Sequence, residues 1–366
     1  MKKIYSLHVR VLTGLVFLLA FVASCKKDSK DVTPAAPTNY ATIGLYEYAN
    51  ATNRRAYVPI TKVGTVTTAY LSIFDTGSTG MTIDADGLLP ASMITSNGIT
   101  VTGDSVVVNG ITVTSQQATI SYGGVGGITK EYGNLAYASV VMGDANGKVT
   151  ASRIPFFLYY KAVDGITGKT LPTHSNDVFG VGPGTSATSS SIASPLSYFK
   201  LAPKITNGFK LAMFNNGSFS TTTPTYVSGL LTIGLTPNDL SSSGFIMHPM
   251  LTHSGAYYPD IAGTINYNGT NVAAEILFDT GTPSISILED AAATSNITTL
   301  PAGTNVIFTT ANGFSYTYTT TSNYNLTQVE RPSYSLDIRT IFSIDFFISN
   351  EYLLDYTNHK IGLKNN

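Results

Sequence analysis

The stretch Leu71-Ser-Ile-Phe-Asp-Thr-Gly-Ser-Thr-Gly-Met-Thr-Ile83 ends an apolar run in an aspartate, Asp75, and follows it at once with Thr-Gly-Ser. The pattern returns as Ile276-Leu-Phe-Asp-Thr-Gly-Thr-Pro-Ser-Ile-Ser-Ile287, where Asp279 takes the same place. The two aspartates are 204 positions apart (279 − 75) in a chain of 366 residues. One Asp-Thr-Gly can arise by chance, but two copies in the same apolar context are a specific signal. They predict two similar lobes that meet at a pair of carboxylates.

The first residues have the pattern of an export signal. Basic residues among the first ten precede an apolar run over residues 11–24, which is shorter than the roughly 20 residues of a membrane span. The run ends in Val22-Ala-Ser-Cys25, which resembles the lipobox of bacterial lipoproteins. We therefore predict a lipoprotein signal peptide at 1–24, lipidation of Cys25 and a lipid-anchored, solvated tether at 25–40. The resemblance implies an exported bacterial lipoprotein, held at the outer membrane or cell surface.

The rest of the chain has the composition of a β protein. Charged residues make up 12% of the sequence, against roughly 25% in an average soluble domain, and the formal net charge is −1. Thr, Val and the 22 Tyr favour strands, whereas Gly and Asn clusters mark turns. Alternation with period 2 recurs, as in 105–114 and 315–320, and only 194–201 and 289–293 are expected as short helices. We predict an all-β fold, and without a basic excess we expect no nucleic-acid partner.

Other catalytic chemistries find little support in the sequence. Cys25 is the only cysteine and lies in the leader, so a cysteine nucleophile is excluded from the folded part. A Ser-His-Asp arrangement stays open, although no motif supports it. The histidines show no metal-ligand spacing, and we expect neither a metal nor another cofactor. The five histidines are His8, His174, His248, His253 and His359.

Three further segments extend the paired motif into a family resemblance. Residues 118–141 place Tyr122 and Gly123 in a Gly-rich stretch and resemble the flap hairpin of pepsin-like aspartic proteases. Residues 176–182 and 341–348 are similar to the strands that support the two catalytic loops in that family. The likeness covers nearly everything from Tyr57 to Leu363.

The resemblance implies a fold and a division of the chain. We expect a bilobal pepsin-like acid protease fold, in which two β-barrel-like lobes are related by a pseudo-twofold axis and enclose a cleft. The N-terminal lobe, with the first Asp-Thr-Gly and the flap, is predicted at 41–205. The C-terminal lobe, with the second Asp-Thr-Gly, is predicted at 206–366. We expect the protein to be a monomer.

The same resemblance implies the roles of the site residues. Asp75 and Asp279 would share a proton and activate a water, since peptide hydrolysis without a metal or nucleophile needs one group to take a proton and another to give one. Hydrogen-bond donors around the carboxylates favour the charged form, which indicates an acidic working range. Tyr122 and Gly123 would belong to the flap that closes over the substrate. The residues expected to support the dyad are Thr76, Gly77, Ser78, Thr280, Gly281 and Thr282.

Two positions depart from the family pattern. Ser343 stands where the second supporting strand usually has Gly, so the packing under the Asp279 loop is expected to differ. Thr82 stands where the family has a Trp, so Tyr122 is expected to lose its usual hydrogen-bond partner.

The function predicted from these residues is that of a membrane-anchored aspartic endopeptidase whose partner is a polypeptide substrate. A second hypothesis is a non-catalytic surface lipoprotein of pepsin-like fold that binds polypeptide or glycan. A third is a purely structural β-rich lipoprotein, in which the paired motif would be coincidence. The intact motif in both halves favours the enzyme.

Overall fold

The computed structural model describes residues 40–123 and 129–365. The predicted signal peptide, Cys25, and all of the predicted tether except Tyr40 lie outside this part of the chain, as do five residues of the predicted flap. Strands dominate the described residues, which confirms the predicted all-β class. No helix among them is long and apolar enough to cross a membrane.

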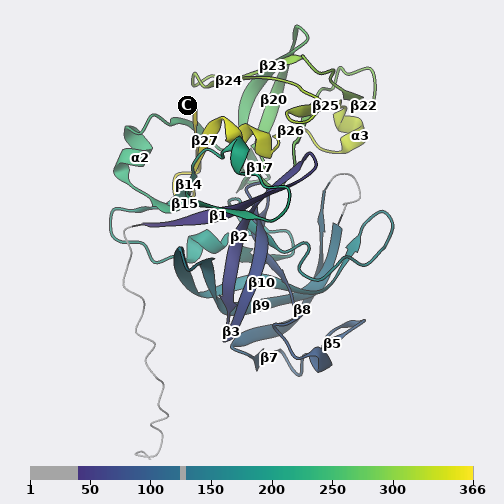
Figure 1. Cartoon of the computed structure of the whole chain (residues 1–366), viewed down its shortest axis with the longest axis vertical. Coiled ribbons are helices and arrows are strands. Elements are labelled where there is room, and N and C mark those ends of the chain that lie inside the picture. Colours follow the sequence, from purple (N-terminus) through teal and green to yellow (C-terminus); the bar gives the residue numbers. More distant parts are fainter. Residues whose placement is uncertain (1–39, 124–128, 366) are drawn as a thin grey trace, which may run out of the picture. The chain divides into compact units, whose positions relative to one another are not determined.

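The larger sheet has 14 strands and joins segments from both halves of the chain (Figure 1). It therefore runs across position 205/206, and the lobe boundary placed there stays a prediction. In spatial order the strands are β16 (Ile246–Pro249), β28 (Lys360–Asn365), β27 (Asn350–Asp355), β14 (Thr206–Leu211), β15 (Thr225–Leu235), β1 (Ala41–Asn50), β2 (Asn53–Val63), β3 (Val66–Asp75), β11 (Val178–Val181), β4 (Thr79–Asp84), β10 (Gly147–Asp164), β9 (Thr129–Asp144), β8 (Ile111–Tyr122) and β7 (Ser105–Val108).

The second sheet has eight strands, all from the second half of the chain. In spatial order they are β22 (Ile297–Thr299), β25 (Leu326–Glu330), β21 (Ile285–Glu289), β26 (Arg339–Phe342), β20 (Thr270–Phe278), β19 (Asp260–Tyr267), β23 (Asn305–Thr309) and β24 (Ser315–Thr319). Three small two-stranded sheets complete the set: β5 (Ile94–Thr95) with β6 (Gly98–Ile99), β12 (Thr185–Ser186) with β13 (Ser189–Ala193), and β17 (Thr252–His253) with β18 (Ala256–Tyr257).

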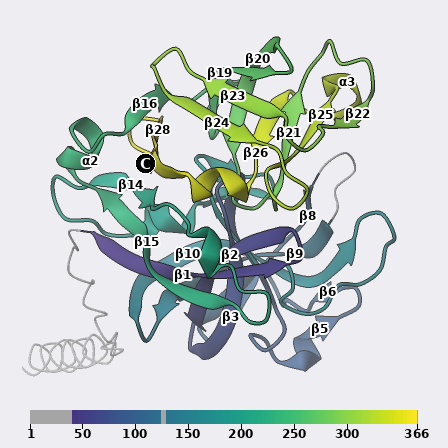
Figure 2. The ribbon, with the colours of Figure 1, turned by 45° about the horizontal axis from the view of Figure 1, so that its top comes forward.

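Each aspartate motif is carried by the same three-strand unit. In the first half, β11 lies between β3 and β4, parallel to β3 and antiparallel to β4. In the second half, β26 lies between β20 and β21 in the same way (Figure 2). Strand β3 ends at Asp75, and β20 ends one residue before Asp279. The repeated sequence pattern thus corresponds to a repeated local fold that delivers each aspartate at the end of a strand.

Helices are short in the described part of the chain. The helix predicted at 194–201 is present as a 3₁₀ turn, but the one predicted at 289–293 is wrong. Strand β21 continues to Glu289, which is buried beside Glu330 of β25, and Asp290 then starts a turn by accepting the N–H of Ala292 at 2.8 Å. The helices are α2 (Pro237–Ser241), α3 (Pro332–Ser335) and 3₁₀ turns at Ala91–Met93, Pro195–Tyr198, Asn216–Ser218 and Ile344–Ile348.

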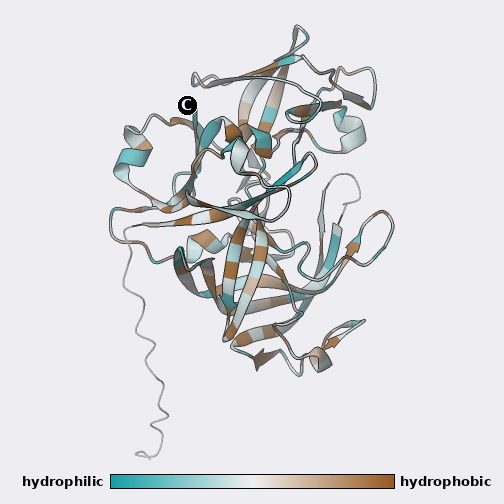
Figure 3. Cartoon of the chain, in the orientation of Figure 1, coloured by the Kyte–Doolittle hydropathy of each residue, from teal (hydrophilic) through white to brown (hydrophobic). Residues whose placement is uncertain are grey.

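The core follows from the period-2 pattern of the strands. In β24 the burial alternates along Ser-Tyr-Thr-Tyr-Thr, so that Tyr316 and Tyr318 point inward. Apolar segments recur in this way along the strands of the large sheet (Figure 3). Asn109 and Gly110 join β7 to β8 with positive φ angles of 52° and 72°, which is the geometry a tight hairpin turn requires.

Candidate active site

The two Asp-Thr-Gly loops meet through their threonines. The Thr76 hydroxyl donates to the carbonyl of Phe278 at 2.6 Å, and the Thr280 hydroxyl donates to the carbonyl of Phe74 at 2.6 Å. Each threonine also accepts the backbone N–H of the other, at 3.0 and 3.1 Å. Both side chains are fully buried. This symmetric hydrogen-bond network fixes one loop against the other, although the two threonines are 204 positions apart in sequence.

The glycines of the motifs let each loop approach the opposite carboxyl group. A Cβ added at Gly77 would lie 2.5 Å from Cγ of Asp279, and one added at Gly281 would lie 2.6 Å from Cγ of Asp75. Any side chain at either position would collide with a carboxyl group. The requirement for glycine therefore comes from the closeness of the two loops rather than from an unusual φ angle.

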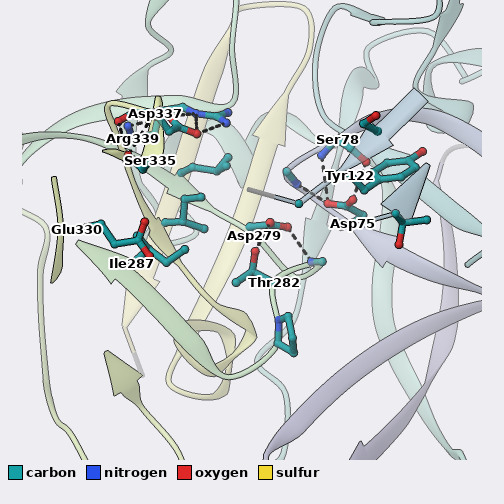
Figure 4. Close-up of a pocket in the computed structure, with 18 of the residues that line it drawn as sticks. Asp75, Ser78, Tyr122, Asp279, Thr282, Ile287, Glu330, Ser335, Asp337 and Arg339 are labelled. Atoms are coloured by element: carbon teal, nitrogen blue, oxygen red, sulfur yellow. Dashed lines mark hydrogen bonds and ion pairs between the residues drawn. The ribbon is translucent and has the colours of Figure 1, made fainter. Parts of the chain in front are cut away.

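Each carboxylate accepts hydrogen bonds from its own loop. Asp75 Oδ1 accepts the N–H of Gly77 at 2.8 Å, and its Oδ2 accepts the Ser78 hydroxyl at 2.6 Å. Asp279 Oδ1 accepts the N–H of Gly281 at 2.7 Å, and its Oδ2 accepts the Thr282 hydroxyl at 2.6 Å. These donors orient both carboxyl groups toward one cleft (Figure 4).

The electrostatics of the pair oppose double ionisation. Burial, reinforced by the neighbouring charge of Asp279 and a hydrogen bond with it, raises the pKa of Asp75 to about 8, against the lowering effect of Ser78 and Gly77. Two carboxyl groups in such contact hold one proton between them over a wide pH range. The donors alone indicated an acidic working range, but burial and like charge outweigh them here. A singly protonated pair can therefore persist up to neutral pH.

The cleft around the pair has a volume of about 950 Å³, the size of a small-molecule or peptide site. Both aspartates line it, as do Gly77, Ser78, Gly281 and Thr282, whereas Thr76 and Thr280 lie beneath it. Tyr122 and Gly123 line its N-terminal side. The structure thus brings the sequence-predicted site residues together, with the exception of Cys25, which lies outside the described part.

Arg55 is a cleft residue that the sequence analysis missed. Its Nη1 donates to the carbonyl of Gly281 at 2.5 Å, and its charge faces Asp279 and Asp75. Burial lowers the pKa of Arg55, but a guanidinium stays protonated at any pH at which a protein folds. The cation therefore favours ionised carboxylates beside it. A signal was present in Arg54-Arg55, a basic pair inside a strand of a chain otherwise poor in charge.

The flap residue Tyr122 has a different partner from the one expected of the family. Its hydroxyl points to the Thr82 hydroxyl at 3.5 Å, which is long compared with the roughly 2.8 Å of a good O–H···O bond. Glu131 is fully buried, and its carboxyl group faces the Thr82 hydroxyl, which acts against the effect of burial on its pKa. Burial raises the pKa of both Glu131 and Tyr122 well above their ordinary values, and the charge of Glu131 adds to the effect on Tyr122. Thr82, Glu131 and Tyr122 form a buried polar group that replaces the single partner.

The C-terminal end of the cleft is acidic. Glu289 and Glu330 both line it. Burial raises the pKa of Glu289 to about 6 and also raises the pKa of Glu330. Asp337 also lies there, but it is bound by Arg339 at 2.8 Å (Figure 4). Two carboxyl groups, neither in an ion pair with a residue that the structure describes, therefore line this end of the cleft.

Ser343 has hydrogen-bond partners under the second loop, and a change of packing relative to glycine stays a prediction. Its hydroxyl accepts the N–H of Asp345 at 3.4 Å and so caps the 3₁₀ turn that starts at Ile344. Its own N–H donates to the Ser286 hydroxyl at 3.2 Å. The extra side chain is accommodated because the chain turns into a helix here instead of continuing as a strand.

Comparisons with known proteins establish the fold alone. No protein-family model matches the sequence, and no curated protein does. The structure, in contrast, is similar to a pepsin-like enzyme, the aspartic proteinase from Irpex lacteus, with a TM-score of 0.59. The match covers 89% of this chain and 97% of that chain at 18% sequence identity. The chain therefore has the bilobal all-β fold of pepsin-like aspartic proteinases.

Proposed function

We propose that the protein is an aspartic endopeptidase that hydrolyses peptide bonds with a water activated between Asp75 and Asp279. The observation that carries the proposal is the symmetric pair of loops, each of which presents a carboxylate to one cleft and is fixed by the buried threonines. A pepsin-like fold alone would not support activity, because folds host unrelated functions. The support comes from the oriented pair.

The expected mechanism needs only proton transfer by the pair. The ionised carboxylate takes a proton from the water as its oxygen attacks the peptide carbonyl carbon, and the protonated carboxyl gives its proton to the carbonyl oxygen. The tetrahedral intermediate then collapses and the C–N bond breaks. The departing amine receives a proton from the pair, and one hydroxyl of the intermediate gives its proton back to the pair. Tyr122 would close over the peptide and limit water access.

The acidic end of the cleft favours peptides with a basic side chain at the position that reaches Glu289 and Glu330. Pairing with Lys or Arg would offset the cost of keeping two carboxylates close together in a partly buried site. The charge of Arg55 near the dyad favours an acidic or polar neighbour at the other end.

A peptide-library digest tests the proposal. The full-length protein is incubated with the library between pH 3 and 8, with and without pepstatin, and the products are read by mass spectrometry. We expect internal cleavage that pepstatin blocks, with Lys or Arg enriched at one position near the cut. Peptides that co-purify uncut would instead support the non-catalytic binding hypothesis. The hydrogen bond that Arg55 donates to the Gly281 carbonyl beside the dyad favours that second hypothesis.

We also propose that the enzyme is anchored to the outer membrane or cell surface through a lipid on Cys25. The support is the position of the single cysteine at the end of an export signal. Cys25→Ala should release the protein from the membrane fraction and leave its thermal midpoint unchanged. Mass spectrometry of a mature N-terminus without acyl groups would reject the anchor.

A further inference from the structure

Three side chains from separate segments converge beside the second catalytic strand. His253 comes from the β17–β18 hairpin, Asp260 from the start of β19, and Glu275 from β20. His253 Nε2 lies 3.1 Å from Oε2 of Glu275 and 3.9 Å from Oδ2 of Asp260. One ligand atom from each residue lies within 4.8 Å of the other two.

The local fold fixes this convergence. In the antiparallel ladder of β19 and β20, Asp260 pairs with Leu277 and Ala262 pairs with Glu275, so Asp260 and Glu275 are near neighbours. The carbonyl of Asp260 accepts the N–H of Leu251 at 2.8 Å, which ties the strand to the segment that leads into the hairpin of His253. The ring of His253 then packs edge-on against Tyr258, with 5.1 Å between ring centroids.

The facing atoms lack hydrogen bonds. Asp260 is fully buried, and neither of its carboxylate oxygens has a partner within the described residues. His253 Nε2 and Glu275 Oε2 are buried atoms and are also without a hydrogen bond in that part, although they lie only 3.1 Å apart. One possible ligand atom from each of the three residues therefore lies in the same small space, and a buried carboxylate without a hydrogen bond is costly.

The charges around Asp260 also favour a bound cation. Asp260 is surrounded by the carboxylates of Glu275 and Asp337 and by the guanidinium of Arg339. Arg339 donates its side-chain hydrogen bonds to the carboxylate of Asp337, at 2.8 to 3.2 Å. Neither Asp260 nor Glu275 has an ion pair with a lysine or arginine among the described residues; each lies only against His253. A divalent cation between the two carboxyl groups would balance their charge.

We propose that His253, Asp260 and Glu275 bind a divalent metal ion of the zinc type. One imidazole nitrogen and two carboxylate oxygens are a donor set that suits Zn²⁺, whereas Ca²⁺ and Mg²⁺ prefer oxygen alone. Tetrahedral zinc with bonds of about 2.1 Å places its ligands about 3.4 Å apart, and the separations of 3.1 and 3.9 Å fall on either side of that value. A water would complete the four ligands.

The site would act as a structural clamp and not as a part of the dyad. Asp260 pairs with Leu277, which lines the cleft two residues before Asp279. A metal here would fasten the β17–β18 hairpin to the strand that delivers the second aspartate. Sequence spacing could not reveal it, because the histidine and the two carboxylates lie 7 and 15 positions apart along three segments (260 − 253 and 275 − 260).

Zinc titration of the full-length protein tests the proposal without any measurement of proteolysis. The protein is stripped with EDTA and titrated calorimetrically with ZnCl₂ at pH 7, and its thermal midpoint is measured with zinc and with EDTA. We expect one zinc per chain and a higher midpoint with zinc, since a ligand bound only by the folded state stabilises it.

Matched variants locate the site. His253→Gln and Glu275→Gln should each weaken zinc binding by at least about tenfold, the loss seen even for residues that only orient a ligand. Asp104→Asn, an exposed carboxylate elsewhere in the chain, should bind like the wild type. Glu275 is partly exposed, so Glu275→Gln is expected to fold. A substitution of the fully buried Asp260 could prevent folding and is therefore not used. Absence of zinc binding in the wild type, or equal affinity in the Gln variants, overturns the site.

Discussion

The two Asp-Thr-Gly loops make nearly the same hydrogen bonds but rest on different supports. Asp75 and Asp279 each accept one N–H from the glycine of the motif and one hydroxyl from the residue after it. Below the first loop lies Gly180 of β11, where an added Cβ would be 2.7 Å from the Ser78 hydroxyl. Below the second lies Ser343, whose side chain is hydrogen-bonded and fully buried.

The cores behind the loops differ as well. Phe278, Phe342 and Phe346 pack ring on ring behind the second loop, with centroids 4.4 to 5.8 Å apart. Behind the first, Phe74 has one ring contact, with Phe209 at 6.0 Å. The chemistry at the surface of the site thus tolerates quite different packing underneath, as long as the hydrogen-bonding groups of the loops keep their places.

The sharpest test of equivalence is to neutralise each aspartate in turn. Asp75→Asn and Asp279→Asn should each lower kcat by about a thousandfold or more, because an amide can neither take the proton from water nor share one with its partner. Peptide cleavage measured under the same conditions for both variants gives the comparison, with circular dichroism as the control for folding. Turnover close to wild type in either variant would remove that residue from the mechanism.

The difference in support predicts unequal costs for small substitutions. Gly180→Ala should lower the free energy of unfolding by about 2 to 3 kcal/mol, since its methyl group would collide with the Ser78 hydroxyl and the carbonyl of Gly80. Ser343→Ala loses a cap and one weak contact, so about 1 kcal/mol is expected. Thermal unfolding of both variants measures the contrast, and equal costs would show that the supports are equivalent after all.

Much of this comparison could be predicted from sequence because it is local. The strand that ends at Asp75, its copy before Asp279 and the supporting strand at 178–181 all appear as short apolar runs beside glycine or serine. The second supporting strand was predicted at 341–348, but β26 covers 339–342 and residues 344–348 form a 3₁₀ turn that Ser343 caps. Arg55 and Glu131 could not be assigned in this way. Each faces the site only because a distant strand folds over it, and a single charged residue in a strand carries no local pattern. The helix wrongly predicted at 289–293 has the same cause, since Glu330, the β25 residue that pairs with Glu289, lies 41 positions further along the chain (330 − 289).

Arg55 makes the two loops electrostatically unequal, since it is hydrogen-bonded to the second loop alone. Its cation favours the ionised form of the pair, so Arg55→Gln should raise the pKa values of both titrations, by about half to one unit. Both limbs of the pH profile of kcat/KM would then move to higher pH, including the basic limb expected near the pKa of about 8 at Asp75. Arg55→Lys keeps the charge and should leave the limbs in place. A profile unchanged in the Gln variant would show that the charge is screened.

The smallest effect is expected at Tyr122 of the predicted flap, which lies on the side of the cleft that carries the first loop. Thr82 is 2% exposed, so a larger side chain would overpack the site, but Thr82→Val keeps the size of the side chain and removes the hydroxyl that faces both Tyr122 and Glu131. At 3.5 Å that contact is weak, and its loss should cost no more than about 1 kcal/mol, a several-fold reduction in kcat/KM. The control is Glu131→Gln, which leaves the hydroxyl contact intact but removes the buried acid. A larger loss in Glu131→Gln than in Thr82→Val would show that the buried carboxyl positions Tyr122, and a null result in both would mean that the tyrosine is held by residues of the flap itself.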